Sequence, residues 1–354
     1  MNLKSRIIIL ILVITLFLSA VLSQTFAVEM LYKSSKSSKR KQASKKIIGA
    51  WLPYWDKAKV NRAFTRNKKT MNEMSPYWYY VLPNAKLRPT SKFNLRQVRE
   101  AKKAGVKVIP MVSNHYNGAL ISKIIRNRTL RRRHIRILVN MAVKRRVHGV
   151  ELDYEGLLQK DRKVYSSFVK ELARALHRKK KLLSVTVQAK VKEPGHSGST
   201  KAQSWKTIGK YADRVRIMAY DYHWKTSPPG AIAPISWVKR IARLAKKTIP
   251  AKKAMMGIGT YGYNWYGDGR AKPITLHQAR MIAKRRKKRL RRDKKTGEVY
   301  LRLKPGRPGI WIQDSGSLRS KLKIVKKYKL GGVFFWRMGN EDAKHWRVVR
   351  QELR

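Results

Sequence analysis

Short runs of β-branched, aromatic and other apolar residues recur along this chain and alternate with longer amphipathic segments rich in lysine and arginine. The runs have the length and composition of strands, whereas segments such as Tyr165–Arg178 and Ile235–Lys247 carry apolar residues at helical spacing. The predicted strands are Ile47–Trp51, Tyr77–Leu82, Val106–Val112, Gly149–Asp153, Leu183–Ala189, Arg214–Tyr220, Met255–Thr260 and Gly331–Trp336.

Strands that alternate with helices favour right-handed βαβ units and a parallel sheet. Eight such units suggest closure into a (β/α)8 TIM barrel, whose active site would lie at the C-terminal ends of the strands. An open doubly wound sheet is the alternative, but no glycine-rich phosphate-binding turn follows the first strand. We therefore predict an α/β fold with a barrel over residues 47–354.

The interval between the seventh and eighth predicted strands is too long for a single helix. It contains a predicted basic helix at Ala279–Arg292 and two predicted strands, Glu298–Leu303 and Gly309–Gln313. These elements predict a small α+β insertion at about residues 266–315. A last helix at Ser317–Tyr328 would then lead into the eighth strand.

The N-terminus has the order of regions found in secretory signals. Lys4 and Arg6 precede a nearly continuous apolar run at residues 7–22, and Thr25-Phe26-Ala27 offers a cleavage site. We predict a signal peptide at residues 1–27 and a flexible basic linker at residues 28–46. The alternative is an uncleaved membrane anchor, for which the run is slightly shorter than the ~20 apolar residues of a spanning helix. Both interpretations predict a secreted or cell-surface protein.

Composition separates this protein from disordered basic chains. The 354 residues include 84 Lys or Arg and 19 Asp or Glu, which gives a formal charge of +65. Yet 43% of the residues are hydrophobic, with 10 Trp and 16 Tyr, which disordered basic tails lack. The sequence has no cysteine, so disulfides, thiolate metal sites and thiol catalysis are excluded.

Acidic residues are scarce, but three of them fall at alternate positions, Glu151, Asp153 and Glu155, in and after the fourth predicted strand. Side chains alternate between the two faces of a strand, so these carboxyl groups share one face, which in a barrel is the interior. Like charges so close together raise the pKa of at least one carboxyl group, as a general acid requires. The alternative is an exposed strand with a solvated acidic edge.

This segment reads His148-Gly-Val-Glu151-Leu-Asp153-Tyr-Glu155 and resembles the Asp-Gly-x-Asp-x-Asp-x-Glu signature of glycoside hydrolase family 18, the chitinase-like barrels. His148 stands in place of the first Asp and Glu151 in place of the middle one. Further motifs resemble the family in the right order, and the parts after the sixth strand are most similar to the bacterial spore-cortex and cell-wall glucosaminidases. These further motifs are Met218-Ala-Tyr220-Asp221, Gly257–Trp265, Trp336, Ala231–Ile249 and Trp311–Asp342.

The resemblance implies a retaining, substrate-assisted mechanism without a metal or an organic cofactor. It implies that Glu155 is the general acid and base, that Asp153 and Tyr220 hold the substrate's 2-acetamido group, and that Asp221 and Trp336 bind the sugar ring. Glu151 could still share a proton with Asp153, and the change at His148 should affect barrel packing more than chemistry.

Two further residues have both a functional and a structural interpretation. Trp51 could line the sugar cleft or belong to the core. Asn114, at the end of the third predicted strand, could contact substrate or cap a loop.

Two hypotheses of function follow from these residues. The first is an exported β-N-acetylglucosaminidase or chitinase that acts on peptidoglycan or a chitin-like glycan. The second is a non-catalytic, lectin-like binder of cell-wall glycan on the same fold. The basic surface predicts attachment to anionic wall polymers. Nucleic acid is the rival partner, although the motifs of a dedicated nucleic-acid reader are absent.

Overall fold

The computed structural model describes residues 21, 24–30, 46–90, 95–266, 270–303 and 309–354. The chain divides into two units, Met1–Lys45 and Lys46–Arg354. In the first unit, residues 24–30 are helical. Most of the predicted signal peptide and linker, including nearly all of the apolar run at 7–22, lies outside the described residues. Within the part of the chain that the structure describes, no helix is both long enough and apolar enough to cross a membrane.

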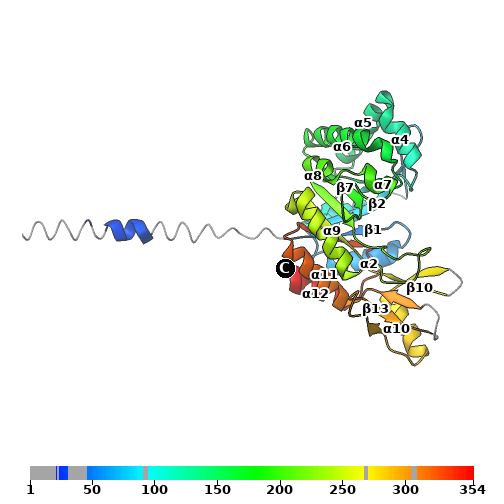
Figure 1. Cartoon of the computed structure of the whole chain (residues 1–354). Helices are drawn as coiled ribbons and strands as arrows, with labels where there is room; N and C mark the ends of the chain where they lie inside the picture. Colours follow the sequence, from blue (N-terminus) through cyan, green and yellow to red (C-terminus); the bar gives the residue numbers. More distant parts are fainter. Residues whose placement is uncertain (1–20, 22–23, 31–45, 91–94, 267–269, 304–308) are drawn as a thin grey trace, which may run out of the picture. The chain divides into compact units, whose positions relative to one another are not determined.

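The second unit contains a closed barrel of parallel strands, as predicted (Figure 1). Around the barrel, β1 is followed by β2, β5, β6, β7, β8, β9 and β15, and β15 pairs again with β1. The short strand β4 also pairs with β2, and β3 adds to β2 in the antiparallel direction. The strands of this sheet are β1 (Ile47–Leu52), β2 (Glu73–Val81), β3 (Leu87–Pro89), β4 (Lys107–Val108), β5 (Met111–Ser113), β6 (Gly149–Asp153), β7 (Leu182–Gln188), β8 (Arg214–Met218), β9 (Ala254–Gly259) and β15 (Gly332–Trp336).

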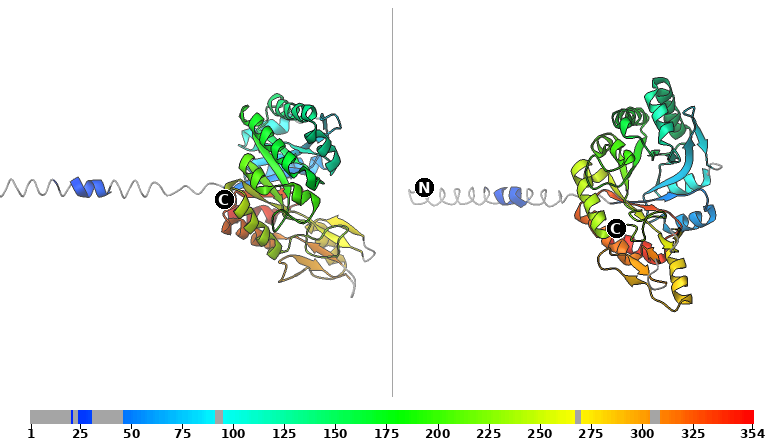
Figure 2. Two further views of the ribbon diagram at one scale, coloured as in Figure 1. Left: turned by 45° about the horizontal axis from the view of Figure 1, so that its top comes forward. Right: turned by 45° about the vertical axis from the view of Figure 1, so that its right-hand side comes forward.

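The helices lie outside the strands and cover them, which the two turned views make clear (Figure 2). Their apolar faces pack on the sheet, while most of their lysines and arginines face solvent. The helices of this layer are α2 (Lys57–Asn67), α3 (Leu95–Lys103), α4 (Gly118–Arg126), α5 (Arg128–Lys144), α6 (Arg162–His177), α7 (Gly198–Ala202), α8 (Trp205–Tyr211), α9 (Ile235–Thr248), α11 (Ser315–Lys327) and α12 (Ala343–Leu353).

Between β9 and α11 the chain forms a second sheet with its own small apolar core. The predicted basic helix at 279–292 is wrong in its bounds, because α10 begins at a Thr275–Gln278 capping box and ends at Arg285. Arg291–Arg292 instead form a short edge strand that pairs with Val299 and Tyr300. The elements here are β10 (Gly262–Trp265), β11 (Ala271–Ile274), α10 (Leu276–Arg285), β12 (Arg291–Arg292), β13 (Val299–Leu301) and β14 (Ile310–Ile312).

Strand β6 is buried on both faces, since all five of its residues are buried. Val150 and Leu152 point toward the helix layer, and Glu151 and Asp153 point into the barrel. The alternative of an exposed strand with a solvated acidic edge is therefore excluded. Burial on both faces is typical of parallel strands covered by helices.

Candidate active site

A cavity of about 760 Å³ opens at the C-terminal ends of the barrel strands. This is the end at which barrel enzymes carry their catalytic residues. The walls combine carboxyl groups with aromatic rings, and strands β5, β6, β7, β8 and β15 or the loops after them contribute most of the lining. The principal lining residues are Trp51, Tyr116, Asp153, Glu155, Gln188, His196, Ser197, Thr200, Tyr220, Asp221, Tyr222, Trp224, Lys225, Trp237 and Trp336.

Asp153 and Glu155 stand side by side on this cavity, one at the end of β6 and one two residues further along. Burial raises the pKa of Glu155 to about 7; a hydrogen bond from Gln188 opposes this rise and the charge of Asp221 adds to it. Burial, with the charges of Glu155 and Glu151, raises the pKa of Asp153 well above its usual value. No Lys or Arg among the described residues forms an ion pair with either carboxyl group. The pair therefore holds a proton near neutral pH.

The backbone of Glu155 is held by Asn114. Asn114 Nδ2 donates to the carbonyl oxygen of Glu155 over 2.7 Å, and the Glu155 N–H donates to Asn114 Oδ1 over 2.9 Å. Gly156 follows in the left-handed region at φ +65°, where a Cβ atom would lie 2.3 Å from the carbonyl oxygen of Tyr116. Asn114 is only 2% exposed and is not among the residues that line the cavity. Both ends of its amide are used to orient Glu155.

Glu151 lies beneath the cavity, with 0% exposure and four donors around its two oxygens. Oε1 accepts from Trp51 Nε1 over 3.0 Å and from the Thr186 hydroxyl over 2.6 Å. Oε2 accepts from the Ser75 hydroxyl and forms an ion pair with Arg216. Arg216 also pairs with Glu73 over 3.1 Å.

These four donors occupy the lone pairs of an ionised carboxylate, which has about four acceptor positions. Glu151 does not line the cavity, so a contact with substrate and a proton shared with Asp153 stay predictions. Its role in this structure is to tie Arg216 and the indole of Trp51 into the barrel interior. His148, the other departure from the family signature, accepts a backbone hydrogen bond from Val108 through Nδ1 over 2.9 Å.

Tyr220 and Asp221 follow β8 and both line the cavity. Asp221 adopts φ +58°, a conformation that non-glycine residues rarely take and that occurs at functional sites. Its Oδ1 accepts from the Tyr261 hydroxyl over 2.5 Å and from the Tyr263 hydroxyl over 3.3 Å. The protein atoms crowded around Asp221 raise its pKa, against the effect of these two hydrogen bonds.

Aromatic rings form the floor and rim. Trp51 is 1% exposed but reaches the cavity, and its ring meets that of Trp336 edge to face at a centroid distance of 6.1 Å. Both interpretations of Trp51 thus hold, because it belongs to the core and lines the cavity. On the rim, Tyr222 packs against Trp237 of α9 at 5.2 Å. Exposed aromatic faces beside polar groups suit the apolar faces of sugar rings.

Sequence reasoning missed several residues of the cavity, notably Tyr116, Gln188 and Lys225. Gln188 is the last residue of β7, and Nε2 donates to the Tyr116 hydroxyl over 3.0 Å. A polar residue at the C-terminal end of a barrel strand was the available signal for Gln188. Tyr116 and Lys225 come from loops, whose course the sequence pattern does not predict.

Comparison with known proteins connects this site with a family. The profile of glycosyl hydrolases family 18 matches residues 30–341. An uncharacterized glycosylase, YvbX of Bacillus subtilis, is 30% identical over 267 residues, which cover 72% of this chain and 78% of that protein. The cortical fragment-lytic enzyme of Bacillus cereus is 27% identical over 309 residues, covering 82% of this chain and 71% of that protein.

Solved structures show the same fold at lower sequence identity. The spore cortex-lytic enzyme SleL of Bacillus megaterium superposes with a TM-score of 0.80 at 22% identity, over 87% of this chain and 74% of that one. A chitinase of Chromobacterium violaceum superposes with a TM-score of 0.81 at 23% identity, over 87% of this chain and 99% of that one.

Proposed function

This chain belongs to glycosyl hydrolases family 18 and is a glycosidase, and we propose that it is an exported enzyme that cleaves β-1,4 bonds next to N-acetylglucosamine in peptidoglycan or a chitin-like glycan. Relatives named cortical fragment-lytic enzyme and chitinase support this choice of substrate. The observation that carries the proposal is the pair Asp153 and Glu155, which faces an aromatic-lined cavity without a cation partner among the described residues. As a glycosidase, the chain is not the non-catalytic binder considered as the alternative.

In the proposed mechanism, Glu155 donates its proton to the glycosidic oxygen and later accepts a proton from water. A pKa of about 7 suits both steps, because the carboxyl group is partly protonated at neutral pH. Such a group typically contributes about 10²–10⁴ to the rate. Asn114 supports the role by fixing the backbone of Glu155.

The nucleophile in this mechanism is the carbonyl oxygen of the substrate's own 2-acetamido group, so no enzyme nucleophile is needed. Asp153 accepts a hydrogen bond from the acetamide N–H and stabilises the positive charge of the oxazolinium intermediate. Its Oδ1 is buried and has no hydrogen-bond partner in the structure, which leaves it free for this contact. Tyr220 donates to the acetamido oxygen, and Asp221 positions the sugar ring over Trp336.

The test is mass spectrometry of the products from purified peptidoglycan, from chitin oligomers and from the same oligomers after complete de-N-acetylation. We expect cleavage after N-acetylglucosamine in at least one N-acetylated substrate, with retained configuration at the new reducing end by NMR. We expect no cleavage of the de-N-acetylated oligomer, since it lacks the attacking oxygen. Efficient cleavage of that oligomer would contradict the substrate-assisted mechanism.

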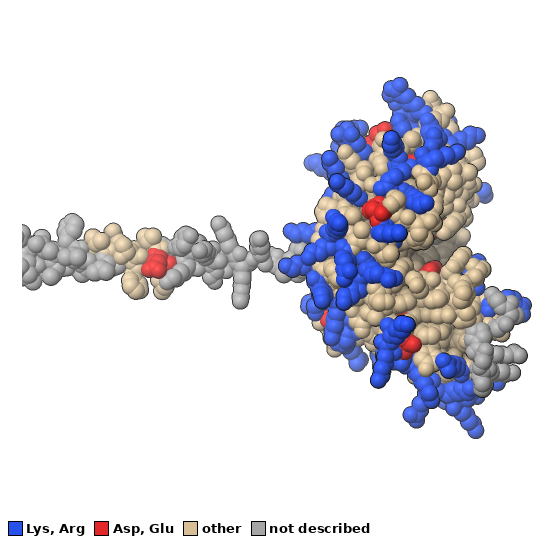
Figure 3. Space-filling model, viewed as in Figure 1, with Lys and Arg blue, Asp and Glu red and all other residues tan. Residues whose placement is uncertain are grey.

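The charged outer surface supports attachment to an anionic wall polymer. Lys and Arg side chains stand over much of the face shown in Figure 3, with few acidic residues between them. A groove of about 420 Å³ between α5 and α6 is lined by five cations, Arg132, Arg136, Arg174, Arg178 and Lys179. The one acidic residue in the groove, Glu171, already pairs with Arg131 over 3.3 Å. We propose that this groove contributes to wall binding, and that export follows from the predicted N-terminal signal.

A further inference from the structure

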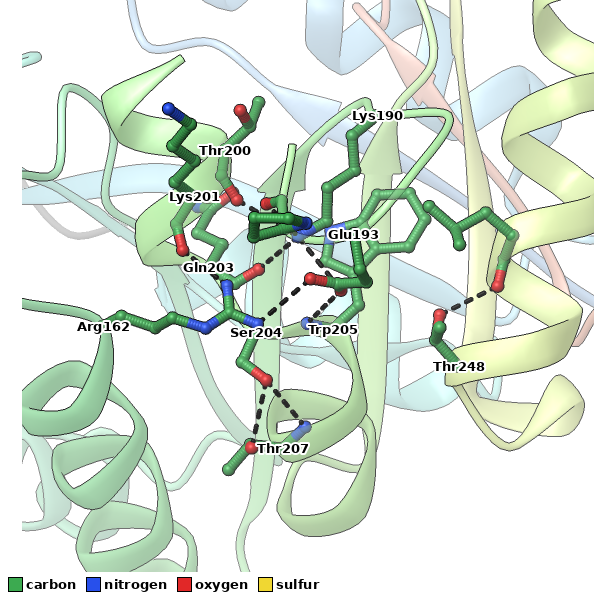
Figure 4. A network of polar contacts seen from close by, with 12 residues as sticks. Arg162, Lys190, Glu193, Thr200, Lys201, Gln203, Ser204, Trp205, Thr207 and Thr248 are labelled. Atoms are coloured by element: carbon green, nitrogen blue, oxygen red, sulfur yellow. Dashed lines mark hydrogen bonds and ion pairs between the residues drawn. The ribbon is translucent and has the colours of Figure 1, made fainter. Parts of the chain in front are cut away.

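A lysine with no access to solvent lies beside the catalytic cavity. Lys190, two residues after β7, is 1% exposed, and its ammonium group donates to three backbone carbonyl oxygens (Figure 4). The N···O distances are 3.2 Å to Pro194, 3.1 Å to Thr200 and 2.6 Å to Gln203. An ammonium group has three hydrogens, so these contacts use all of them.

The charge of Lys190 is compensated within the same network. Nζ lies 3.1 Å from Glu193 Oε1 and 5.3 Å from the centre of the Trp205 ring. Glu193 also pairs with Arg162 over 3.1 Å, and its Oε1 accepts from the backbone N–H of Trp205 over 3.2 Å. A buried charge is tolerated only with this degree of pairing and hydrogen bonding.

The three carbonyl groups come from different parts of the segment between β7 and α8. This segment also supplies four residues of the cavity wall, Ala189, His196, Ser197 and Thr200. Lys190 therefore holds three parts of this segment together through one ammonium group, directly behind that wall. A side chain without a cation could not satisfy three converging carbonyl groups.

The network continues from Lys190 to the proposed general acid. Gln203, whose carbonyl oxygen accepts from Lys190, accepts through Oε1 from the backbone N–H of Gln188 over 2.8 Å. Its Nε2 donates to the carbonyl oxygen of Tyr154 over 3.3 Å. Gln203 thus bridges the ends of β7 and β6, and these carry Gln188 and Glu155, which both line the cavity.

We propose that Lys190 is a positioning residue, which holds Gln203 between β6 and β7 and so fixes the two strand ends that place Gln188 and Glu155 on the cavity wall. The proposal rests on the proposed function only for the role given to Glu155. The network itself belongs to the free protein, so its effect on Glu155 can be measured without substrate.

The consequence is electrostatic and has a definite sign. A donor near a carboxylate favours the ionised form, so Gln188 lowers the pKa of Glu155, and a displacement of Gln188 would raise that pKa. The other ionisable groups around Glu155 are Asp153, Asp221, Tyr77, Tyr116 and Tyr220, and a variant at Lys190 leaves them in place. Lys190 itself has a pKa lowered by burial to about 8, with Glu193 opposing and Arg162 reinforcing the effect.

The experiment compares Lys190→Met with Lys321→Met. Lys321 is a matched control, because it is also 1% exposed and donates to Glu298 over 2.6 Å and Gln313 over 2.5 Å, but it has no contact with the Glu155 network. We would titrate the Glu155 carboxyl carbon by ¹³C NMR in the free protein and record kcat/KM against pH on an N-acetylated oligomer.

We expect Lys190→Met to move the Glu155 midpoint upward by about 0.5–1 pH unit, which corresponds to a loss of about 1 kcal/mol in stabilisation of the carboxylate. Gln203→Leu should also move the Glu155 midpoint upward, because this variant removes both side-chain contacts of Gln203 and keeps its backbone carbonyl group. Gln203→Leu replaces Lys190→Met as the test if Lys190→Met does not fold. Lys321→Met should leave the midpoint unchanged.

A wild-type midpoint in folded Lys190→Met or Gln203→Leu, or an equal shift in Lys321→Met, would overturn the proposal. If no N-acetylated glycan is cleaved by the wild-type protein, the proposed function fails. The NMR titration still decides the role of Lys190 in that event.

Discussion

Two regions of the barrel interior surround carboxyl groups with opposite environments. Glu151, on β6, has four donors around it, one of which is the guanidinium of Arg216. Asp153 and Glu155, only two and four residues further along, have no ion pair with a Lys or Arg in the described chain, although the sequence contains 84 such residues. The first carboxylate is part of the framework, and the other two keep a raised pKa for chemistry.

The difference shows that position along one strand decides between structure and reactivity. Below the cavity, Arg216 lies 3.5 Å from the centre of the Phe334 ring and joins Glu73 and Glu151. At the mouth, the cavity wall combines aromatic rings, hydroxyl groups and amides, and Lys225, which also lines it, forms no ion pair with Asp153 or Glu155. A cation paired with either carboxyl group would lower its pKa and so remove the proton that catalysis needs.

The largest expected effect comes from a change in the carboxyl pair at the cavity, Asp153 and Glu155. Glu155→Gln removes the acidic proton while keeping the shape of the side chain, so hydrolysis should fall by about 10²–10⁴ or more. Binding of an N-acetylated oligomer, measured by calorimetry, should stay within about threefold, which corresponds to less than 1 kcal/mol. Unchanged turnover in this variant would remove Glu155 from the mechanism.

In the buried network below the cavity, Glu151→Ala should strongly reduce the free energy of unfolding. It leaves the buried Arg216 with Glu73 alone and leaves the Trp51 indole N–H without its acceptor. Removing one partner of a buried ion pair typically costs about 3–5 kcal/mol. Urea unfolding of Glu151→Ala beside Asp153→Ala measures the contrast, and a similar loss of unfolding free energy in both variants would contradict it.

Asp153→Asn should reduce the rate by about tenfold to a hundredfold, on the order of 1.4–2.7 kcal/mol, since the amide cannot stabilise a cationic intermediate. It should also shift the titration of the site to lower pH, because the repulsion between the two carboxylates, which raises the pKa of Asp153, is gone. The alkaline limb of the kcat/KM profile should therefore move to lower pH. An alkaline limb at the wild-type position would show that the two carboxyl groups titrate independently.

The raised pKa of Glu155, which suits catalysis, also predicts that the folded protein loses stability as the pH rises. Between about pH 4.5 and 7 the folded protein holds a proton that the unfolded chain releases, so stability falls as pH rises through this window. Glu155→Gln should remove this loss and raise the Tm at pH 8 by about 2 °C, which corresponds to about 1 kcal/mol. At pH 4 the variant and the wild type should unfold at the same temperature.

The smallest effect concerns the outer surface, where charges are solvated. Neutralising Arg132, Arg136, Arg174 and Arg178 to Gln should weaken wall binding by about 1 kcal/mol more than neutralising Lys239, Arg240, Arg243 and Lys246 of α9. The two variants have the same net charge. Binding should fall steeply with salt, since charges are screened over about 10 Å at 0.1 M, whereas turnover of a neutral oligomer should change little.

Equal losses in the two variants would assign wall binding to the whole positive surface rather than to the groove between α5 and α6. Preferential binding of nucleic acid by the groove would identify the rival polyanion as its partner.

The sequence by itself determined the eight strands and the order of the barrel, because apolar periodicity and the spacing of strands and helices are local properties. It also placed Asp153, Glu155, Tyr220, Asp221 and Trp336 near one another, since all of them stand at or just beyond strand ends. Strands that run parallel bring those ends to one side of a barrel whatever the details of packing.

Only the tertiary structure decided what the remaining polar residues do. The predicted second strand began at Tyr77, so Glu73 and Ser75 were not expected in the interior. The partners of Glu151 could therefore not be predicted. Lys190, Gln203 and Asn114 act through contacts across 4–49 positions of sequence. Such contacts depend on loop paths and on burial, which no local pattern encodes, because a buried polar group is defined by the neighbours that the fold brings to it.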